Sequence, residues 1–167
     1  ILPGVGAFDD AARKLSETGM ADVVKREAAA GKPVMGICLG MQLLFDVSYE
    51  YGVHEGLGLI RGSVRPIADV VPQNYKIPHI GWNLLKFRKE SPLFRYINEN
   101  DYVYFVHSYY LKAQDPGIVT ATAQYGVEIH ASVEKGNVFA CQFLPEKSSE
   151  IGLRMLENFI RITGRDG

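Results

Sequence analysis

The sequence has few cysteines, little net charge and no long apolar run, and each of these absences excludes a class of protein. Its 167 residues include only two cysteines, Cys38 and Cys141, which excludes a secreted scaffold held together by many disulfides. The formal net charge of −1 argues against a nucleic acid or an anionic membrane as a partner. No apolar run is long enough to span a bilayer, and no signal-peptide pattern is seen. We therefore expect a protein of the reducing cytoplasm.

Apolar residues, by contrast, are plentiful. They make up 47% of the sequence, which is enough for one domain with a sizeable core. There is no internal repeat, low-complexity segment or long linker, so we expect a single domain over residues 1–167. The chain opens on Ile1-Leu2-Pro3-Gly4 without an initiator methionine, as if a strand ended two residues into the chain. We therefore expect this domain to be truncated at its N-terminus.

The most informative stretch runs from Pro33 to Phe45. Its first part is short and apolar, as in a buried parallel strand, and its second part repeats apolar residues at helical spacing. Cys38 falls on the predicted strand-to-helix turn, with Gly36 two residues before it and Gly40 two residues after it. This is the spacing of a nucleophile elbow, where side chains at the two glycine positions would collide with the neighbouring strand and helix.

Two interpretations of Cys38 are open. As a nucleophile, it would lie at a helix N-terminus, where the helix dipole and free N–H groups favour the thiolate and can bind an oxyanion. As a structural residue, it would be a small buried apolar side chain that ends a core strand, which is the role of most free cysteines. The two glycines and the strand-turn-helix context favour the nucleophile.

The segment before this stretch predicts a strand followed by a helical region. Ile1 and Leu2 resemble the end of a buried strand, and the loop over residues 3–8 contains two glycines that let backbone N–H groups approach a ligand. Asp9 or Asp10 is expected to cap the helical region that follows, which is interrupted at Thr18-Gly19. Strand, helix, strand and helix in this order predict a parallel α/β crossover.

After Phe45, short runs of β-branched and aromatic residues predict a series of strands. The last three runs are separated by turn signals and are expected to form an antiparallel meander. An amphipathic helix over residues 148–163, capped by Ser148 or Ser149, is expected to end the chain. The predicted strands cover residues 58–66, 76–87, 102–112, 118–124, 128–134 and 137–143.

Several motifs carry a resemblance to a known family. Gly-Ile-Cys-Leu-Gly-Met-Gln around Cys38, Pro-Gly-Val-Gly at residues 3–6 and Pro-Glu-Lys-Ser at residues 145–148 resemble the class I (triad) glutamine amidotransferases. Pro-His-Ile-Gly-Trp-Asn at residues 78–83 and Tyr-Phe-Val-His-Ser-Tyr-Tyr at residues 104–110 are most similar to the glutaminase subunits of imidazole glycerol phosphate synthase. The resemblance covers essentially the whole chain.

This resemblance implies a fold and a reaction. The fold would be a three-layer, flavodoxin-like α/β domain with a central mixed, mostly parallel sheet and a C-terminal antiparallel section. A strand-helix-strand unit of roughly 30 or more residues, typical of one βαβ unit, would precede Ile1. Glutamine would be hydrolysed to glutamate and ammonia through a cysteine thioester, and the ammonia would pass to a (βα)8-barrel synthase subunit in histidine biosynthesis. No cofactor and no metal ion is implied.

The resemblance also implies a role for individual residues. Cys38 would be the nucleophile, and the oxyanion would be bound by backbone N–H groups of Leu39 and of the loop Gly4, Val5 and Gly6. The amide end and the amino-acid end of glutamine would be held by Gln42 and by the backbone at Ser108 and Tyr109. The barrel subunit would be contacted by Trp82, Asn83, Tyr104 and Lys147. For Trp82 and Tyr104, core packing remains an alternative, and for Gln42 an exposed position on a helix.

One position departs from the family pattern. The family reads Gln-Phe-His-Pro-Glu-Lys-Ser, whereas this chain carries Leu144 in place of the catalytic histidine. Leucine cannot carry a proton, so Glu146, which would orient the histidine, has nothing to orient. Without an imidazole partner the thiol is expected to stay mostly protonated. Ordinary core or surface roles are expected for the histidines present, which are His54, His79, His107 and His130.

We therefore expect a glutaminase whose hydrolytic step is nearly silenced, because loss of one triad member costs on the order of 10⁴ to 10⁶ in rate. Two other functions remain open. The chain could be a catalytically silent subunit that binds and regulates the barrel synthase. It could also be a different cysteine enzyme such as a peptidase, which would need a histidine near Cys38 that the sequence does not supply.

Overall fold

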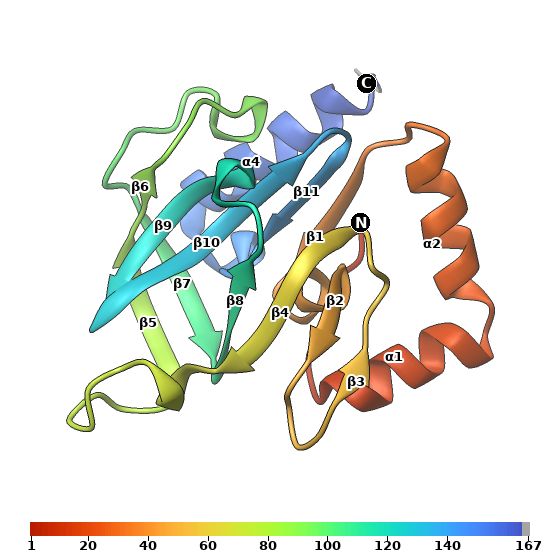
Figure 1. The fold of residues 1–167 in the computed structure, drawn as a ribbon. Helices are drawn as coiled ribbons and strands as arrows, with labels where there is room; N and C mark the ends of the chain where they lie inside the picture. The colour runs from red at the N-terminus through yellow and green to blue at the C-terminus, as the bar shows by residue number, and fades with distance from the viewer. Residues whose placement is uncertain (165–167) are drawn as a thin grey trace.

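The computed structural model describes residues 1–164, whose strands form three sheets (Figure 1). The largest sheet has the order β1 (Val34–Ile37), β11 (Val138–Cys141), β10 (Val127–Lys135), β9 (Val119–Tyr125) and β6 (Lys86–Phe87). The second has the order β3 (His54–Glu55), β2 (Phe45–Ser48), β4 (Ile60–Pro66) and β8 (Tyr109–Ala113). The third is a two-stranded ribbon of β5 (His79–Leu84) and β7 (Tyr102–His107).

Four α-helices accompany these sheets in the described part of the chain. Helices α1 (Phe8–Glu17) and α2 (Met20–Ala29) precede β1, the short α3 (Leu39–Leu43) follows it, and α4 (Ser149–Ile162) comes last. None of the helices within residues 1–164 combines the length and the apolar character needed to cross a membrane. The short 3₁₀ helices are η1 (Ile67–Asp69), η2 (Pro92–Phe94), η3 (Pro116–Ile118) and η4 (Pro145–Lys147).

The largest sheet is buried on both faces. Strand β11 shows the alternation, since Val138 and Ala140 join one hydrophobic cluster and Phe139 and Cys141 join another. The first cluster contains side chains of α1 to α3 and of the second sheet, and the second contains side chains of α4 and β7. In Figure 1, α2 lies on the β1 side of the molecule, α1 lies beside β3, and α4 runs behind the large sheet. The ring of Phe159 on α4 meets the Phe139 ring of β11 edge-on, with 6.0 Å between the ring centroids. The layered α/β class predicted from the sequence is confirmed.

The sheets are mixed, as expected, but the parallel share is smaller than expected. Parallel pairing joins β1 to β11, β2 to β4 and Leu2 to Gly36, and the other strand pairs of the described residues are antiparallel. The predicted meander of β9, β10 and β11 is confirmed. Its tight turns explain the antiparallel share, because a tight turn can join only antiparallel neighbours, whereas parallel strands need a long crossover.

Most predicted strand runs correspond to observed strands, with four differences. The run over residues 76–87 is divided at Leu85 into β5 of the ribbon and β6 of the large sheet. The run over residues 102–112 is broken at Ser108, where the chain leaves the ribbon as β7 and enters the second sheet as β8. The helix after Cys38 ends at Leu43 rather than continuing to Phe45, which begins β2. Strands β2 and β3 were not predicted, because short strands of mixed polarity carry no clear period of two.

The predicted cap of the first helix is wrong, and Ser148 occupies the N-cap position of α4 as predicted but makes no side-chain capping bond. Asp9 and Asp10 lie in the first turn of α1, and the N–H of Phe8 instead donates to Oε2 of Glu50, 2.8 Å away. Ser148 occupies the position before α4, but its hydroxyl donates to the Leu144 carbonyl and accepts from the Tyr104 N–H instead of capping the helix. In both cases a partner distant in sequence replaces the local cap that the residue type favours.

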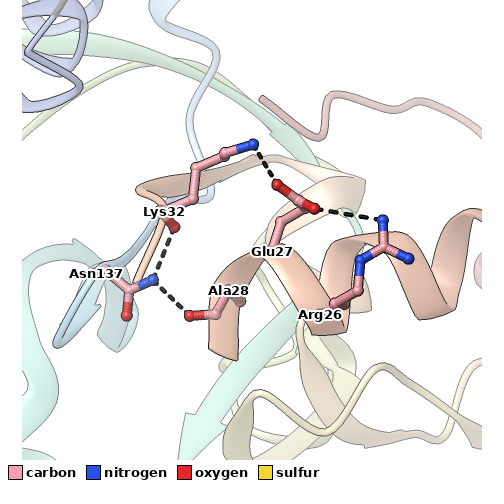
Figure 2. Close-up of polar contacts among 5 residues, drawn as sticks. All are labelled: Arg26, Glu27, Ala28, Lys32 and Asn137. Atoms are coloured by element: carbon pink, nitrogen blue, oxygen red, sulfur yellow. Dashed lines mark hydrogen bonds and ion pairs between the residues drawn. The ribbon is translucent and has the colours of Figure 1, made fainter. Parts of the chain in front are cut away.

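The end of α2 is tied to the large sheet by Asn137, which lies in the turn between β10 and β11. Figure 2 shows its side-chain nitrogen donating to the carbonyl oxygens of Ala28, at 2.8 Å, and Lys32, at 2.7 Å. The ion pairs of Glu27 with Arg26 and Lys32 lie beside these bonds and are largely exposed. Asn137 thus links the last turn of α2, through the Ala28 carbonyl, to the Lys32 carbonyl just before β1.

Replacing Asn137→Ala should lower the free energy of unfolding by about 1 kcal/mol, because the Lys32 carbonyl loses its side-chain donor, whereas the Ala28 carbonyl keeps the Gly31 N–H. Chemical denaturation of both proteins measures the difference. The matched control is Lys32→Ala, which removes an exposed ion pair but keeps the Lys32 carbonyl, and it should leave the stability unchanged within error. Equal destabilisation by the two substitutions would contradict this role of Asn137.

Candidate active site

Cys38 is held on a sharp turn between β1 and α3. Its φ of 54° and ψ of −112° lie in a region that residues other than glycine rarely occupy. The Cys38 N–H donates to the Cys141 carbonyl at 2.8 Å, which continues the parallel ladder between β1 and β11. On the other edge of β1, Leu2 bonds to the backbone of Met35 and Ile37. The predicted strand-to-helix turn is confirmed, and the sheet holds it from both sides.

The two flanking glycines are required by close backbone approach. A Cβ atom at Gly40 would lie 1.7 Å from the carbonyl oxygen of Leu2, far inside van der Waals contact. A Cβ atom at Gly36 would lie 2.7 Å from Cδ1 of Leu44 and 2.8 Å from the carbonyl oxygen of Gly40. The collision predicted from the glycine spacing is therefore present in the structure.

A pocket of about 550 Å³ opens beside Cys38. This volume is within the range of small-molecule sites. Eight residues predicted for the site line it, and they come from four separate segments: Val5, Gly6, Cys38, Leu39, Gln42, Ser108, Tyr109 and Leu144. Gly4 does not line this pocket, because it packs beneath the loop against Leu39. Within residues 1–164, no group of three or more His, Cys, Asp and Glu side chains is placed to hold a metal ion.

The Cys38 thiol is almost fully buried and lies among amide groups. Its Sγ accepts a hydrogen bond from Nε2 of Gln142 at 3.7 Å, and Oε1 of Gln142 accepts one from Nε2 of Gln42 at 3.2 Å. Burial raises the pKa of the Cys38 thiol; the Leu39 N–H and Gln142 oppose this rise, and the charge of Glu146 adds to it. Burial thus outweighs the helix N-terminus, and the thiol is protonated at neutral pH.

Leu144 faces the same pocket as Cys38. Its side chain is 4% exposed, and its backbone is fixed by bonds from its N–H to the Tyr104 carbonyl and from the Ser148 hydroxyl to its own carbonyl. Glu146, two residues later, is exposed and does not line the pocket, although its charge acts on the pKa of Cys38. Position 144, where the family resemblance implies a histidine, therefore opens onto the same pocket as the Cys38 thiol, and the leucine side chain there has no proton to give.

The sequence-based prediction missed several residues at the pocket, which are Glu50, Tyr51, Pro66, Ala68, Ile77, Pro78, Val106, His107 and, against the sulfur, Gln142. Glu50 and Tyr51 line it from the turn after β2, and Gln142 contacts the sulfur from β11's end. Glu50 and Tyr51 carried no local signal, because their approach depends on how the second sheet packs. Gln142 could have been predicted as a site residue, because it lies two residues before Leu144 in the same motif.

His107 also lines the pocket, but both of its ring nitrogens are occupied. Nδ1 is 2.7 Å from the Tyr109 carbonyl oxygen, and Nε2 is 3.0 Å from Nδ1 of His79. Burial lowers the pKa of His107 to about 4, against a small opposing effect of the bond to Tyr109. Burial also lowers the pKa of His79 to about 3. His107 is therefore committed to the backbone and does not serve Cys38 as a base.

The residues predicted to contact a partner lie on both faces of the ribbon. Trp82 is 51% exposed and lies across the ribbon from Tyr104, with their rings edge-on at 5.8 Å, so core packing of Trp82 is excluded. Lys147 is exposed on η4. This 3₁₀ helix begins directly after Leu144, whose N–H donates to the Tyr104 carbonyl of β7. Asn83 differs, because its side chain turns to the opposite face and donates to the Gln124 carbonyl at 2.9 Å. Because side chains alternate along β5, Asn83 lies on the same face of the ribbon as His79 and on the opposite face from Trp82.

Comparisons with known proteins agree with this geometry. A family model described as "Glutamine amidotransferase class-I" matches residues 1–162. "Imidazole glycerol phosphate synthase subunit HisH" of Caldanaerobacter subterraneus subsp. tengcongensis is 52% identical over 159 residues, which are 95% of this chain and 76% of that protein. The HisH subunit of Aquifex aeolicus is 50% identical over 161 residues, 96% of this chain and 76% of that protein. A crystal structure of a glutamine amidotransferase shares the fold, with a TM-score of 0.71 at 20% identity over 97% of this chain and 77% of that one.

Alkylation of Cys38 by iodoacetamide should be slow at pH 7 and should accelerate with pH into the range above the ordinary thiol pKa. The reason is that burial raises the pKa of Cys38, so the reactive thiolate forms only at higher pH. Mass spectrometry of the modified peptide over a pH series gives the rate. Cys141, which is fully buried, serves as the internal control and should remain unmodified. Fast labelling of Cys38 at pH 6 to 7 would show instead that the thiolate is stabilised.

Proposed function

The chain belongs to the class I glutamine amidotransferase family, and on this basis we propose that it is the glutaminase subunit of an imidazole glycerol phosphate synthase in which Leu144 nearly silences the hydrolytic step. The observation that carries the proposal is the strained turn at Cys38, which opens onto a pocket shared with the loop after Leu2 and with Leu144. Identity to HisH subunits near 50% over almost the whole chain supports the narrower assignment. We propose one amidotransferase domain over residues 1–167.

The pocket suits free glutamine as substrate. Cys38 would attack the carbon of the side-chain amide, and the N–H groups of Leu39 and of the loop at Gly4, Val5 and Gly6 would stabilise the oxyanion. Gln42 lies on the wall next to Cys38, where its amide is placed for the reacting end of the substrate. The Glu50 carboxylate is placed for the ammonium group of the amino-acid end, since opposite charges attract most strongly in a partly buried site.

Leu144 interrupts this reaction at the proton-transfer steps. When the carbon–nitrogen bond breaks, ammonia needs a proton to leave, and the water that later attacks the thioester needs a base. The leucine side chain supplies neither, and Glu146 is exposed outside the pocket. The protonated Cys38 thiol adds a further cost, because the thiolate is the nucleophile. Binding of glutamine needs none of these proton transfers and is retained in our proposal.

We further propose that the exposed face of the β5–β7 ribbon docks a (βα)8-barrel synthase subunit. Large apolar side chains gather there in a row, and they are more exposed than is usual for such residues: Ile80, Trp82, Tyr102 and Tyr104, with the first three more than half exposed. Lys147 lies on η4, which is bonded to β7. The two free thiols, Cys38 and Cys141, fit a reducing compartment such as the cytoplasm.

A silent subunit that binds and regulates the barrel synthase is the second candidate. It is favoured by the combination of Leu144 in the pocket with an exposed docking face on the ribbon. The two candidates differ in one measurement, which is product formation by the complete synthase. A silent subunit changes the ammonia-dependent reaction of the barrel and supports no glutamine-dependent reaction, whereas an impaired glutaminase supports a slow one. A peptidase is disfavoured, because the histidine at the pocket, His107, is bonded at both nitrogens.

Restoring the histidine by Leu144→His should raise glutaminase turnover by on the order of 10⁴, since one missing triad member costs about that much. Glutamate formation is measured with and without the barrel subunit. The matched control is Leu144→Gln, which is polar and of similar size but cannot act as a base, and it should give no gain. Adding Cys38→Ala to Leu144→His should abolish the gain. An inactive Leu144→His protein would count against the role assigned to position 144.

Truncating the docking face by Trp82→Ala should weaken binding of the barrel subunit about thirtyfold, the effect of losing about 2 kcal/mol at an aromatic hot spot. Titration calorimetry measures the affinity. Tyr96→Ala is the matched control, because Tyr96 is another exposed aromatic residue, 65% accessible, that lies off the ribbon. Comparable losses from both variants would mean that the ribbon is not the specific docking surface.

A further inference from the structure

A buried pair of histidines connects the ribbon to the substrate pocket. His79 of β5 and His107 of β7 lie opposite each other in the strand register and are 3% and 6% exposed. His79 stacks between the rings of Phe105 and Tyr125, with centroid distances of 4.8 and 3.9 Å. His107 is the member that reaches the pocket wall. Such deeply buried imidazoles need a hydrogen-bond partner at each polar atom.

The hydrogen bonds of the pair all run in one direction. The groups at its two ends, the Tyr109 carbonyl and the Asn83 amide, each determine this direction independently. At one end, the Tyr109 carbonyl can only accept, so Nδ1 of His107 donates and its Nε2 must accept from Nδ1 of His79. At the other end, Oδ1 of Asn83 accepts from the Leu84 N–H, which leaves its amide nitrogen to donate to the Gln124 carbonyl and to Nε2 of His79. Both ends therefore require neutral rings that carry their proton on Nδ1.

The Tyr109 carbonyl, at the end of this series of hydrogen bonds, points away from the neighbouring strand β4. Strand β8 is the edge strand of its sheet, and the Ser108 carbonyl points toward β4, where it accepts from the Ile67 N–H at 2.9 Å. Successive carbonyl groups of a strand point to opposite sides, so the Tyr109 carbonyl points away from β4. His107 fills that position and holds the turn between β7 and β8, where Ser108 and Tyr109 line the pocket.

We propose that His79 and His107 are positioning residues, which fix the Ser108–Tyr109 backbone through a hydrogen-bond chain of single direction and thereby set the affinity for glutamine. The proposal rests on the function proposed above as far as the ligand is concerned. Neither ring contacts the reacting atoms, and His107 does not act on Cys38. The neutral state of both rings follows from their burial, which lowers the pKa of each far below neutrality.

The first test measures the tautomers in the protein as it stands. Long-range ¹H–¹⁵N correlation spectra of the ¹⁵N-labelled chain at pH 7 should show both rings neutral with the proton on Nδ1. This signature is specific, because a histidine that merely fills space is not held to that tautomer. A proton on Nε2 of either ring, or on both nitrogens, would overturn the proposal.

The second test separates the donor from the ring. His107→Asn keeps a donor near the position of Nδ1, whereas His107→Leu removes it. The loss of one buried hydrogen bond should weaken glutamine binding about tenfold in the leucine variant and less than about threefold in the asparagine variant. The ¹³C shift of the Tyr109 carbonyl should change in the leucine variant only. Equal behaviour of the two variants would overturn the proposal.

Two further variants complete the test. One takes the place of His107→Leu if that variant does not fold, and the other is a control outside the pair. If His107→Leu does not fold, His79→Phe keeps the stacking on Phe105 and Tyr125 but removes the donor to His107, whose Nε2 resonance should shift while the Tyr109 carbonyl still holds the proton on Nδ1; a proton on Nε2 of His107 in this variant would overturn the proposal. His130→Asn, outside the pair and the pocket, should change neither the spectra nor the affinity. If the unaltered chain does not bind glutamine, the proposed function fails, and the tautomers and the Tyr109 carbonyl shift still decide the positioning role.

Discussion

The strained backbone of Cys38 is the constraint on which the rest of the site depends. A positive φ at a residue with a side chain is unfavourable by about 1–3 kcal/mol, and it persists only where the surroundings fix it. Here β11 and Leu2 hold β1 from both edges, and the glycines on either side allow the backbones to approach within distances that a Cβ atom would prevent. The turn exposes the sulfur to a pocket, so the position of the nucleophile is a property of the sheet rather than of the local sequence.

Burial without charge is the common feature of the groups around that sulfur. The thiol, the amides of Gln42 and Gln142 and the imidazoles of His79 and His107 are all buried, and each is satisfied by a neutral hydrogen bond. The same desolvation that raises the pKa of Cys38 lowers the pKa of both histidines. With leucine at position 144, the neutral hydrogen bonds from the Leu39 N–H and Gln142 oppose this effect on the thiol, but burial outweighs them. The groups around the sulfur are thus held by neutral hydrogen bonds, and the burial that they share keeps the thiol protonated.

The predictions from the sequence were correct where the residues of one short segment allow only one backbone conformation. The glycine spacing around Cys38 admits few backbones, so the turn and its collisions were predictable, and so was the meander, whose turn residues stand next to alternating runs. They failed where a local preference competes with a distant partner. Asp9 is a good cap by residue type, yet Glu50 reaches the Phe8 N–H first, and the Ser148 hydroxyl bonds to β7 and η4. Asn83 was placed on the docking face, although the alternation of β5 turns it inward.

The sequence by itself determined the family resemblance, the strand-to-helix turn at Cys38 and the leucine where the resemblance implies a histidine, because these reside in residue identities at fixed spacing along one short segment each. Only the tertiary structure decided that the thiol is protonated, that Trp82 is exposed and that His107 serves the Tyr109 carbonyl. These properties depend on desolvation and on donor–acceptor distances between residues far apart in the chain. Such distances are set by how the sheets pack, and no local pattern of residues encodes them.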